Sequence, residues 1–409
     1  MTMAADGRRA QFALQVLQVF GVGATLGTTR TVLPALAEQE FGLARGSFLM
    51  LATFVVVFGL VKATLNFVAG GWSDAHGRRR VLIAGWLVAL PIPLLLYFAR
   101  EWSGVLLACV LLGMNQGLCW SASQLAKLDL AGPARRGLAV GLNEFGGYLG
   151  VAAAGWATAV MAAELGPRAT LAGASGALIV GSLLIAVVAV RDAPGAPTRG
   201  AVALSWHGFS RWSWGDARTL ALNQAGLVEK WVDAAVWLLV PVWLHGRGVA
   251  LADIGLIAGA YGATWGLAQL ATGPLSDRIG RSAVMVPGMW LCGVGLAALP
   301  WFGSVAAWSA CAALCGLGMA ALYPTLVAAV ADHAPAEQRG TALGAYRFWR
   351  DLGYAAGALA IALSVEGGGQ ASAFTVVGGA MALSGAWLAW SGINARSAAR
   401  RGDRDSSAG

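Results

Sequence analysis

The sequence predicts an all-α integral membrane protein whose twelve transmembrane helices form two pseudo-symmetric bundles of six. The first observation is composition: only 12% of the 409 residues are charged and 57% are apolar, whereas a globular protein carries about 25% charged residues. The second is a series of nearly uncharged runs, each long enough to cross a hydrocarbon core of roughly 30 Å. The third is an internal repeat that relates the two halves of the chain.

Length and hydropathy place the spans one after another along the chain, mostly with short connections. The expected spans cover residues 14–36, 48–70, 81–99, 104–126, 138–160, 171–190, 219–243, 254–272, 283–302, 306–330, 341–363 and 371–393. The segment before the first span lacks a signal-peptide cleavage site, so we expect the first helix to be retained.

One long connection divides the spans into two groups. We expect an N-terminal six-helix bundle at 1–190, a central cytoplasmic loop at 191–218, a C-terminal six-helix bundle at 219–394 and a cytoplasmic tail at 395–409. Proline, glycine and arginine keep the start of the central loop irregular. Its later part, with Trp206, Trp212 and Trp214, suits either a plain linker, which we favour, or a short amphipathic segment at the membrane interface.

The distribution of lysine and arginine predicts the orientation of the chain. An even number of spans leaves both termini on one side, and the loops of that side carry 19 of the 28 basic residues, Lys127 among them, against 4 on the other side. By the positive-inside rule we expect both termini in the cytoplasm and the protein in the inner membrane. Because the basic residues are spread over short loops, they form no basic face, and no nucleic-acid partner is expected.

Two blocks of sequence match between the halves at one constant offset of 203 residues. GGWSDAHGRRR at 70–80 aligns with GPLSDRIGRSA at 273–283. Further pairs at this offset are Arg136 and Arg339, Asp129 and Asp332, and Gly150 and Gly353. Agreement of two separated blocks on one offset is hard to obtain by chance. We therefore expect two parallel repeats, an arrangement found in two-domain transporters.

Both copies of the repeat carry the loop pattern G-x-x-x-D-x-x-G-R, after the second and the eighth spans. This pattern resembles the hallmark loop of the major facilitator superfamily, and the resemblance to its twelve-helix bacterial permeases covers essentially the whole chain. The first copy departs from the family at Ala75, where arginine or lysine is usual, whereas the second copy keeps Arg278.

The resemblance implies that this motif takes part in gating. Its residues are Gly70, Asp74, Gly77, Arg78, Gly273, Asp277, Arg278, Gly280 and Arg281. Glycine allows a tight turn, aspartate suits the positive end of a helix, and arginine anchors a loop at lipid headgroups. Asp74 and Asp277 would latch one half against the other, or, as the alternative, would only cap and orient the loops.

Two motifs of the proton-coupled drug exporters in this family are absent. Gln116 and Gly117 are present, but Gly113 stands where those exporters place an arginine. The segment GLNEFGGYLG at 141–150 lacks the proline of their antiporter motif. Drug/proton antiport therefore loses support, although the glycines still favour close packing between helices.

Nine ionisable residues fall inside the predicted spans, where a charge costs at least about 2.5 kcal/mol at the bilayer centre. They are Arg30, Lys62, Glu144, Glu229, Lys230, Asp233, Arg347, Arg350 and Asp351. The third, sixth, ninth and twelfth spans carry none, which agrees with the peripheral position that the family resemblance implies for them. Arg30 and Asp233 occupy equivalent places in the two repeats.

The intramembrane charges predict a site near the midplane. Candidate proton carriers are Glu229, Asp233, Glu144 and Asp351. We favour the first two, because two acids on one helix face disfavour double ionisation. Candidate substrate ligands are the basic residues and four amides: Arg30, Lys62, Lys230, Arg347, Arg350, Asn66, Gln116, Asn143 and Gln269. Static ion pairs among these charges are the alternative.

We expect a secondary active transporter that moves a small molecule by alternating access, driven by protons, with export slightly favoured on family grounds. The alternatives are a proton symporter or uniporter that imports an organic anion and, more remotely, a non-transporting sensor or a membrane enzyme.

The sequence lacks nucleotide-binding and hydrolase motifs, so no enzymatic activity is expected. Cysteines and histidines lack metal-ligand spacing, so we expect no metal or cofactor. The expected partners are the substrate, protons and lipid, and we expect a monomer.

Overall fold

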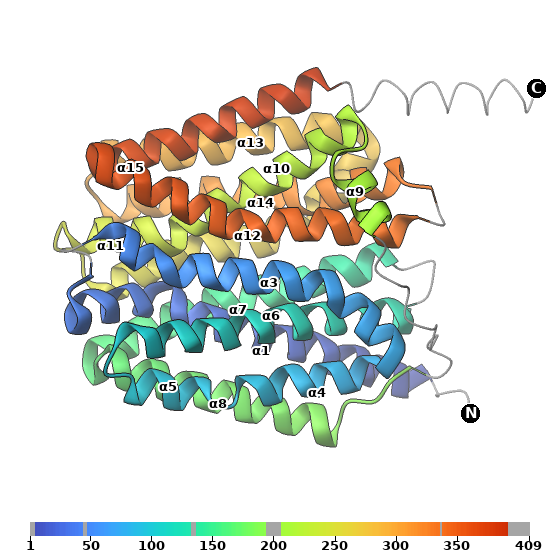
Figure 1. The fold of residues 1–409 in the computed structure, drawn as a ribbon, viewed down its shortest axis with the longest axis horizontal. Helices are drawn as coiled ribbons and strands as arrows, with labels where there is room; N and C mark the ends of the chain where they lie inside the picture. The colour runs from blue at the N-terminus through green and yellow to red at the C-terminus, as the bar shows by residue number, and fades with distance from the viewer. Residues whose placement is uncertain (1–4, 44–46, 132–135, 194–205, 336–337, 392–409) are drawn as a thin grey trace, which may run out of the picture.

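The computed structural model describes residues 5–43, 47–131, 136–193, 206–335 and 338–391. Within these residues every regular element is a helix, and most helices run side by side along one axis (Figure 1). The predicted all-α fold is confirmed.

The first half of the chain contains α1 and α3 to α8. Their bounds are α1 (Ala5–Phe41), α3 (Phe48–His76), α4 (Arg78–Ala89), α5 (Ile92–Phe98), α6 (Trp102–Ala131), α7 (Arg136–Leu165) and α8 (Pro167–Val188). The third predicted span is divided into α4 and α5 by a turn at Leu90 and Pro91. Proline has no backbone N–H to continue the helical ladder, which accounts for the break.

The second half of the chain contains the remaining helices. Their bounds are α9 (Trp206–Trp214), α10 (Ala217–Ala234), η2 (Ala235–Leu239), α11 (Val240–His245), α12 (Leu251–Ile279), α13 (Arg281–Ala298), η3 (Leu299–Trp301), α14 (Val305–His333) and α15 (Arg339–Trp390). η2 is a π-helical stretch that joins α10 to α11 without interruption. α15 contains both of the last two predicted spans, on either side of a kink at Gly369, whose φ of 77° favours glycine.

Nine helices among the described residues are long and apolar enough to cross a membrane. One of them, Thr341–Trp390, holds two predicted spans. Two further predicted spans are also helical, at 217–245 and 251–279, but they carry more polar residues, including Glu229, Lys230 and Asp233 in the first. Together these helices account for all twelve predicted spans.

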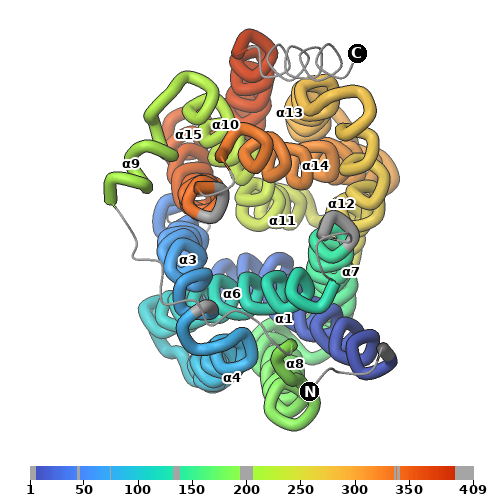
Figure 2. The backbone as a smooth tube through the Cα atoms, turned by 90° about the vertical axis from the view of Figure 1, so that its right-hand side faces the viewer, coloured from blue at the N-terminus to red at the C-terminus, as the bar shows by residue number. Residues whose placement is uncertain are grey.

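The helices form two groups that face each other, with α1 and α3 to α8 in one group and α10 to α15 in the other (Figure 2). The main contacts between the groups are α3 against α15 and α7 against α12. These contacts are equivalent in the repeat, because α3 corresponds to α12 and α7 corresponds to the first part of α15. The end that holds the motif loops 70–81 and 273–283 is termed the motif end, and the other the opposite end.

Matching ion pairs in the two halves reproduce the sequence repeat. Arg78 Nε lies 3.0 Å from Asp129 Oδ2, and Arg281 Nε lies 3.0 Å from Asp332 Oδ2. Each pair ties a motif loop to the last turns of the equivalent helix, α6 or α14. The predicted pseudo-symmetry of the two bundles is confirmed.

In place of the favoured plain linker, residues 206–214 of the central connection form helix α9. Its Phe209 and Trp212 are buried. The ring of Phe209 packs edge-on against Phe67 of α3 and Phe348 of α15, with centroid distances of 5.1 and 5.2 Å. The apolar face of α9 therefore contacts both halves at the motif end.

Lys127 is the charged residue whose position differs most from the prediction. The sequence places it in a basic loop, but α6 continues to Ala131 and buries Lys127 completely. Its Nζ donates to the backbone oxygen of Gln15 on α1 at 2.7 Å. The hydropathy criterion ends a span at the last apolar run, so it leaves out this polar final turn.

Candidate functional site

The charged residues predicted inside the spans are almost all buried. Eight of the nine are at most 6% exposed, and Arg347 is half-buried. Because a buried charge without a partner costs several kcal/mol, the partners of each residue decide what it does. These residues form four groups, centred on Asp233, Glu229, Asp351 and Glu144.

Asp233 of α10 forms an ion pair with Arg30 of α1, and this pair joins the two halves of the molecule. Lys230 Nζ lies 3.2 Å from the other carboxylate oxygen, Oδ2. The hydroxyl of Tyr261 donates to Asp233 at 3.2 Å, and that of Tyr354 also donates to it. Asp233 thus has two cations and two hydroxyl donors around one carboxylate.

Glu229 is paired inside the second half. Its Oε1 accepts a hydrogen bond of 2.9 Å from Nε of Arg350. The guanidinium of Arg350 lies over the ring of Tyr323, 4.0 Å from the centroid. Arg350 is therefore held between a carboxylate and an aromatic face, and it forms part of the wall of a cavity described below.

Asp351 of α15 makes a second link between the halves. Asn66 of α3 donates to Asp351, and Lys62 Nζ lies 3.8 Å from the same carboxylate. The Asn66 oxygen accepts a hydrogen bond of 2.9 Å from Ser121 of α6. Lys62 also lies over the rings of Phe58, Trp120 and Tyr354.

Glu144 of α7 differs from the other acids, since its hydrogen-bond partners are neutral. Its Oε1 accepts from Asn143 at 2.7 Å, from Trp120 at 3.0 Å and from Gln124 at 3.4 Å. The oxygen of Gln124 accepts in turn from Arg347 of α15. Glu144 and Arg347 are therefore connected through Gln124. The sequence analysis identified the first two as candidate site residues but did not identify Gln124.

A cavity of about 20 Å³ lies between the halves, toward the motif end, and has room for about one water molecule. It is lined by Lys62, Asn66, Trp120, Gln124, Tyr148, Tyr323, Arg347, Arg350 and Asp351. Beside it the ring of Tyr148 stacks on Trp265 of α12, with centroids 3.6 Å apart. Five of the predicted ligands and acids meet at this cavity.

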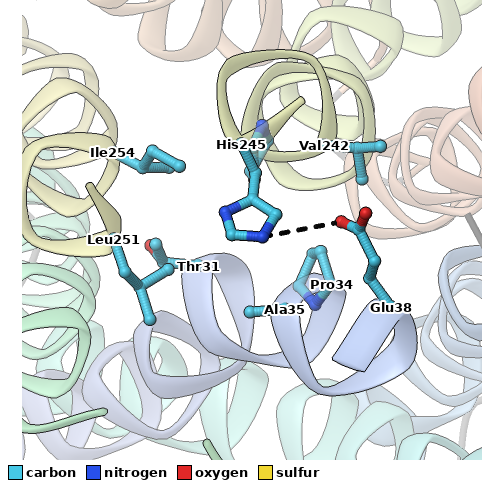
Figure 3. Close-up of a pocket in the computed structure, with 9 residues that line it drawn as sticks. Thr31, Pro34, Ala35, Glu38, Val242, His245, Leu251 and Ile254 are labelled. Carbon is cyan, nitrogen blue, oxygen red and sulfur yellow. Dashed lines mark ion pairs between the residues drawn. The ribbon is translucent and has the colours of Figure 1, made fainter. Parts of the chain in front are cut away.

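The opposite end is closed by contacts between the halves. His245 Nε2 of α11 lies 3.9 Å from Glu38 Oε2 of α1, and both residues line a small pocket together with Pro34 (Figure 3). Ser47 and the backbone N–H of Leu49 donate to Glu366 at 2.8 and 3.1 Å. Below this layer, Trp237 packs edge-on against Phe54 and Phe58 of α3.

Five of the nine predicted ligands do not line the cavity: Arg30 and Lys230 belong to the Asp233 group, Asn143 to the Glu144 group, and the other two are Gln116 and Gln269. Gln116 donates to the backbone oxygen of Val22 at 2.8 Å and so joins α6 to α1. Gln269 donates to the Gly266 oxygen of its own helix at 3.4 Å. Gln124, by contrast, follows Gln116 and Trp120 at four-residue spacing on one face of α6, and this spacing was the signal that would have predicted it.

The motif residues lie at the motif end, within their own halves. Gly77 and Gly280 have φ values of 89° and 97° at the helix ends, a conformation that favours glycine. Arg281 is paired with Asp277 of the same loop at 2.6 Å, and Arg278 is exposed. The side chain of Asp74 is outside the described residues.

A family model described as the Major Facilitator Superfamily matches residues 16–227 and again residues 225–407. The chain belongs to the major facilitator superfamily. Each match covers about one of the two bundles, in agreement with the repeat. As a member of this superfamily, the protein is a multi-pass membrane transporter of a small molecule.

Two curated relatives of this superfamily are similar to the chain. An uncharacterized MFS-type transporter of Salmonella typhimurium is 26% identical, over 81% of this chain and 83% of the relative. A protein of Cupriavidus pinatubonensis, named "Probable 4-methylmuconolactone transporter", is 28% identical over 61% of this chain and 62% of the relative.

Solved structures of the superfamily have the same fold. The human organic anion transporter MFSD10 (TETRAN) is 19% identical, with a TM-score of 0.71, over 93% of this chain and 99% of that one. A mutant form of the nucleoside transporter NupG is 12% identical, with a TM-score of 0.74, over 93% of this chain and all of that one. At these identities the likeness concerns the fold.

Proposed function

We propose that this superfamily member transports a small organic anion together with protons by alternating access. The observation that carries the proposal is the charge of the cavity between the halves. Three basic side chains, those of Lys62, Arg347 and Arg350, line it, against one acidic side chain, that of Asp351. A guanidinium binds a carboxylate through two parallel hydrogen bonds. The cavity therefore favours an anion over a cation.

Aromatic side chains make the rest of the lining suitable for an organic molecule. Trp120, Tyr148 and Tyr323 line the cavity, and aromatic side chains pack well against an apolar ligand body. The relative named as a probable 4-methylmuconolactone transporter is named for a small lactone. A small organic substrate of this kind is compatible with polar anchors set among aromatic rings.

The position of Asp351 supports coupling to protons. Its carboxylate lines the cavity and lies 3.8 Å from the Lys62 ammonium. An ionised Asp351 repels a bound anion and competes with it for the same cations, whereas a neutral Asp351 does neither. Anion and proton then favour each other's binding, and this linkage is reciprocal. We therefore favour import of the anion by proton symport. The family resemblance alone slightly favoured export.

The pair of Arg30 and Asp233 supports a second step, the opening of the opposite end. This pair connects α1 to α10 and is fully enclosed. Separating it without replacement leaves two buried charges, at a cost of about 3–5 kcal/mol. Protonation of Asp233, together with a substrate carboxylate at Arg30, removes that cost. On this basis we propose Asp233 as a further proton carrier. Glu229, which is paired with Arg350, stays a candidate from the sequence.

Gating and orientation complete the proposal. The motif end and both termini would face the cytoplasm of the inner membrane, as the basic loops favour. The motif carboxylates Asp74 and Asp277 would latch the halves together when the motif end closes. In the described conformation Asp277 is paired with Arg281 instead, which is compatible with a latch that is released while the opposite end is closed. A monomer contains both halves that this cycle needs.

The proposal is tested with purified protein in liposomes, using 4-methylmuconolactone and benzoate as probes and a pH-sensitive dye outside. We expect uptake of a probe to make the external medium more alkaline, and a protonophore to abolish that signal. External acidification during uptake would indicate exchange, and probe flux without proton movement would remove the coupling. Selective flux of organic cations in place of both anions would contradict the anion proposal.

Arg347→Gln is the variant that addresses the site directly. It removes the one guanidinium of the cavity that forms no ion pair within the described residues, so we expect about a tenfold weaker apparent affinity for the transported anion. Arg211→Gln is the matched control, because Arg211 is exposed on α9. Equal affinities of the two variants would contradict the assignment of Arg347.

A further inference from the structure

Gln124 of α6 connects an acid of one half to a base of the other. Its Nε2 faces Glu144 Oε1 at 3.4 Å, and its Oε1 accepts a hydrogen bond from Arg347. Gln124 is itself 3% exposed and lines the cavity between the halves. The amide thus spans the distance between a carboxylate on α7 and a guanidinium on α15.

The two oxygens of the Glu144 carboxyl group have different surroundings. Glu144 is 1% exposed, all three donors address Oε1, and Oε2 is buried without a hydrogen-bond partner among the described residues. An ionised carboxylate with an oxygen left unsatisfied in an apolar interior is costly. A neutral carboxyl lowers that cost and gains a hydroxyl donor.

Ionisable groups from the elements around α7 also face Glu144. Lys127 of α6, Tyr148 of α7 and Tyr323 of α14 interact with it electrostatically. The Lys127 ammonium donates to the Gln15 backbone oxygen and not to Glu144. The charged group that reaches Glu144 through a hydrogen-bonded side chain is Arg347, by way of Gln124.

Arg347 is suited to capture a substrate. It is half-buried at the cavity and, within the described residues, it forms no ion pair, in contrast to Arg30 and Arg350. Its partner is the amide oxygen of Gln124, a neutral acceptor that a carboxylate outcompetes. Release of that amide makes the guanidinium available to an anion.

We propose that Gln124 is a positioning residue that couples protonation of Glu144 to substrate capture by Arg347. With Glu144 ionised, the Gln124 NH₂ group points to the carboxylate, and its oxygen holds Arg347. With Glu144 neutral, the new hydroxyl donates to Gln124 Oε1 after the amide has turned over. The carboxyl and Arg347 then compete for one acceptor, and Arg347 is freed. This mechanism rests on the proposed anion–proton symport.

The first experiment needs no substrate. Infrared spectra of the purified protein are recorded across a pH titration, following the stretching band of protonated carboxyl groups. We expect Glu144→Gln to remove one titrating band and Gln124→Met to shift the midpoint of that band. Gln224→Met is the matched control, since the Gln224 amide donates to Ala221 of its own helix. It is expected to leave the titration as in the wild type.

The second experiment measures the KM for 4-methylmuconolactone in liposomes, in mildly acidic and mildly alkaline buffer. We expect the wild type and Gln224→Met to show a KM about tenfold lower in acid. Gln124→Met and Glu144→Gln should show a smaller difference, because Asp351 still couples the proton to the anion in both variants. A Gln124→Met protein with the wild-type infrared midpoint and wild-type pH dependence of KM overturns the coupling role. A Glu144→Gln protein that keeps the full wild-type pH dependence of KM also overturns it, and this result decides the matter if Gln124→Met does not fold.

The two proposals can fail separately. Absence of flux for the lactone in the wild type counts against the proposed substrate class, while the infrared titration still decides whether Gln124 controls the Glu144 carboxyl. A Glu144 band that is absent from the wild type, or that Gln124→Met leaves unshifted, overturns the inference even if anion–proton symport is found.

Discussion

At the level of single residues, partners distinguish side chains that look alike in the sequence. Asp233 and Glu144 are both buried carboxylates on central helices. Asp233 faces Arg30 and Lys230, whereas the hydrogen bonds to Glu144 come from amides and an indole. An ion pair stabilises the charged form of Asp233, whereas Glu144 forms no ion pair among the described residues, so its protonation breaks none.

The pair of Glu229 and Arg350 leads to a prediction about stability. Arg350→Met leaves the Glu229 carboxylate buried without its partner, so we expect the free energy of unfolding to fall by about 3–5 kcal/mol. The double variant Glu229→Gln/Arg350→Met removes both charges of this pair and should lose clearly less than the sum of the two single variants. Thermal unfolding of the purified proteins measures both, with Arg211→Met on exposed α9 as the control. A double variant as unstable as the sum of the two single variants would contradict this account.

At the level of helices, glycine determines how closely the central helices approach one another. A Cβ atom on Gly150 would meet the backbone of α1 at Phe20, and one on Gly353 would meet the backbone of α10 at Leu227. These glycines are equivalent in the repeat. Close helix approach within each half accompanies the pairing of Arg30 on α1 with Asp233 on α10 across the interface.

Two alanine substitutions in α15 separate helix packing from helix propensity. Gly353→Ala places a methyl group against the α10 backbone, and we expect a loss of about 1–3 kcal/mol in stability from overpacking. Gly379→Ala adds the same group in open space and should be neutral or stabilising by up to about 1 kcal/mol, since alanine favours the helix. Chemical or thermal unfolding compares the two. Equal effects at both positions would mean that the close approach is unimportant.

For the molecule as a whole, the structure shows a conformation in which the opposite end is closed. Glu38 with His245, and Ser47 with Glu366, connect the two halves there, and the Arg30–Asp233 pair lies beneath them. The cavity between the halves lies on the other side of this layer, toward the motif end. In the proposed cycle this layer must open, because the substrate would reach the cavity from both sides.

A cross-link across this layer should therefore abolish transport. Ser47→Cys/Glu366→Cys is joined by a short, reducible thiol-reactive linker; the native cysteines are buried and should stay unmodified. We expect anion flux in liposomes to stop on cross-linking and to return on reduction. The matched control, Glu40→Cys/Arg168→Cys, joins two positions at the same end within one half, where the native pair links α1 to α8. Flux that persists through the cross-link would exclude opening at this end.

Composition and motif spacing were enough to predict the membrane fold, the order of the spans, the repeat and the family. These features are local properties of the chain, so they need no knowledge of which helices are neighbours. The low charge content and the 203-residue offset were sufficient for them. The same information also located the intramembrane charges, because a charge inside a long apolar run is visible wherever its helix packs.

Which of those charges meet could be learned only from the packing of the helices. The pairing of Arg30 with Asp233, the neutral surroundings of Glu144 and the position of Gln124 depend on contacts between helices that are far apart along the chain. Lys127 was misplaced because its span was ended at residue 126, whereas α6 continues to Ala131 and the Lys127 ammonium bonds to the backbone of α1. Helical periodicity gives the face on which a residue lies, but packing against other helices determines what that face contacts.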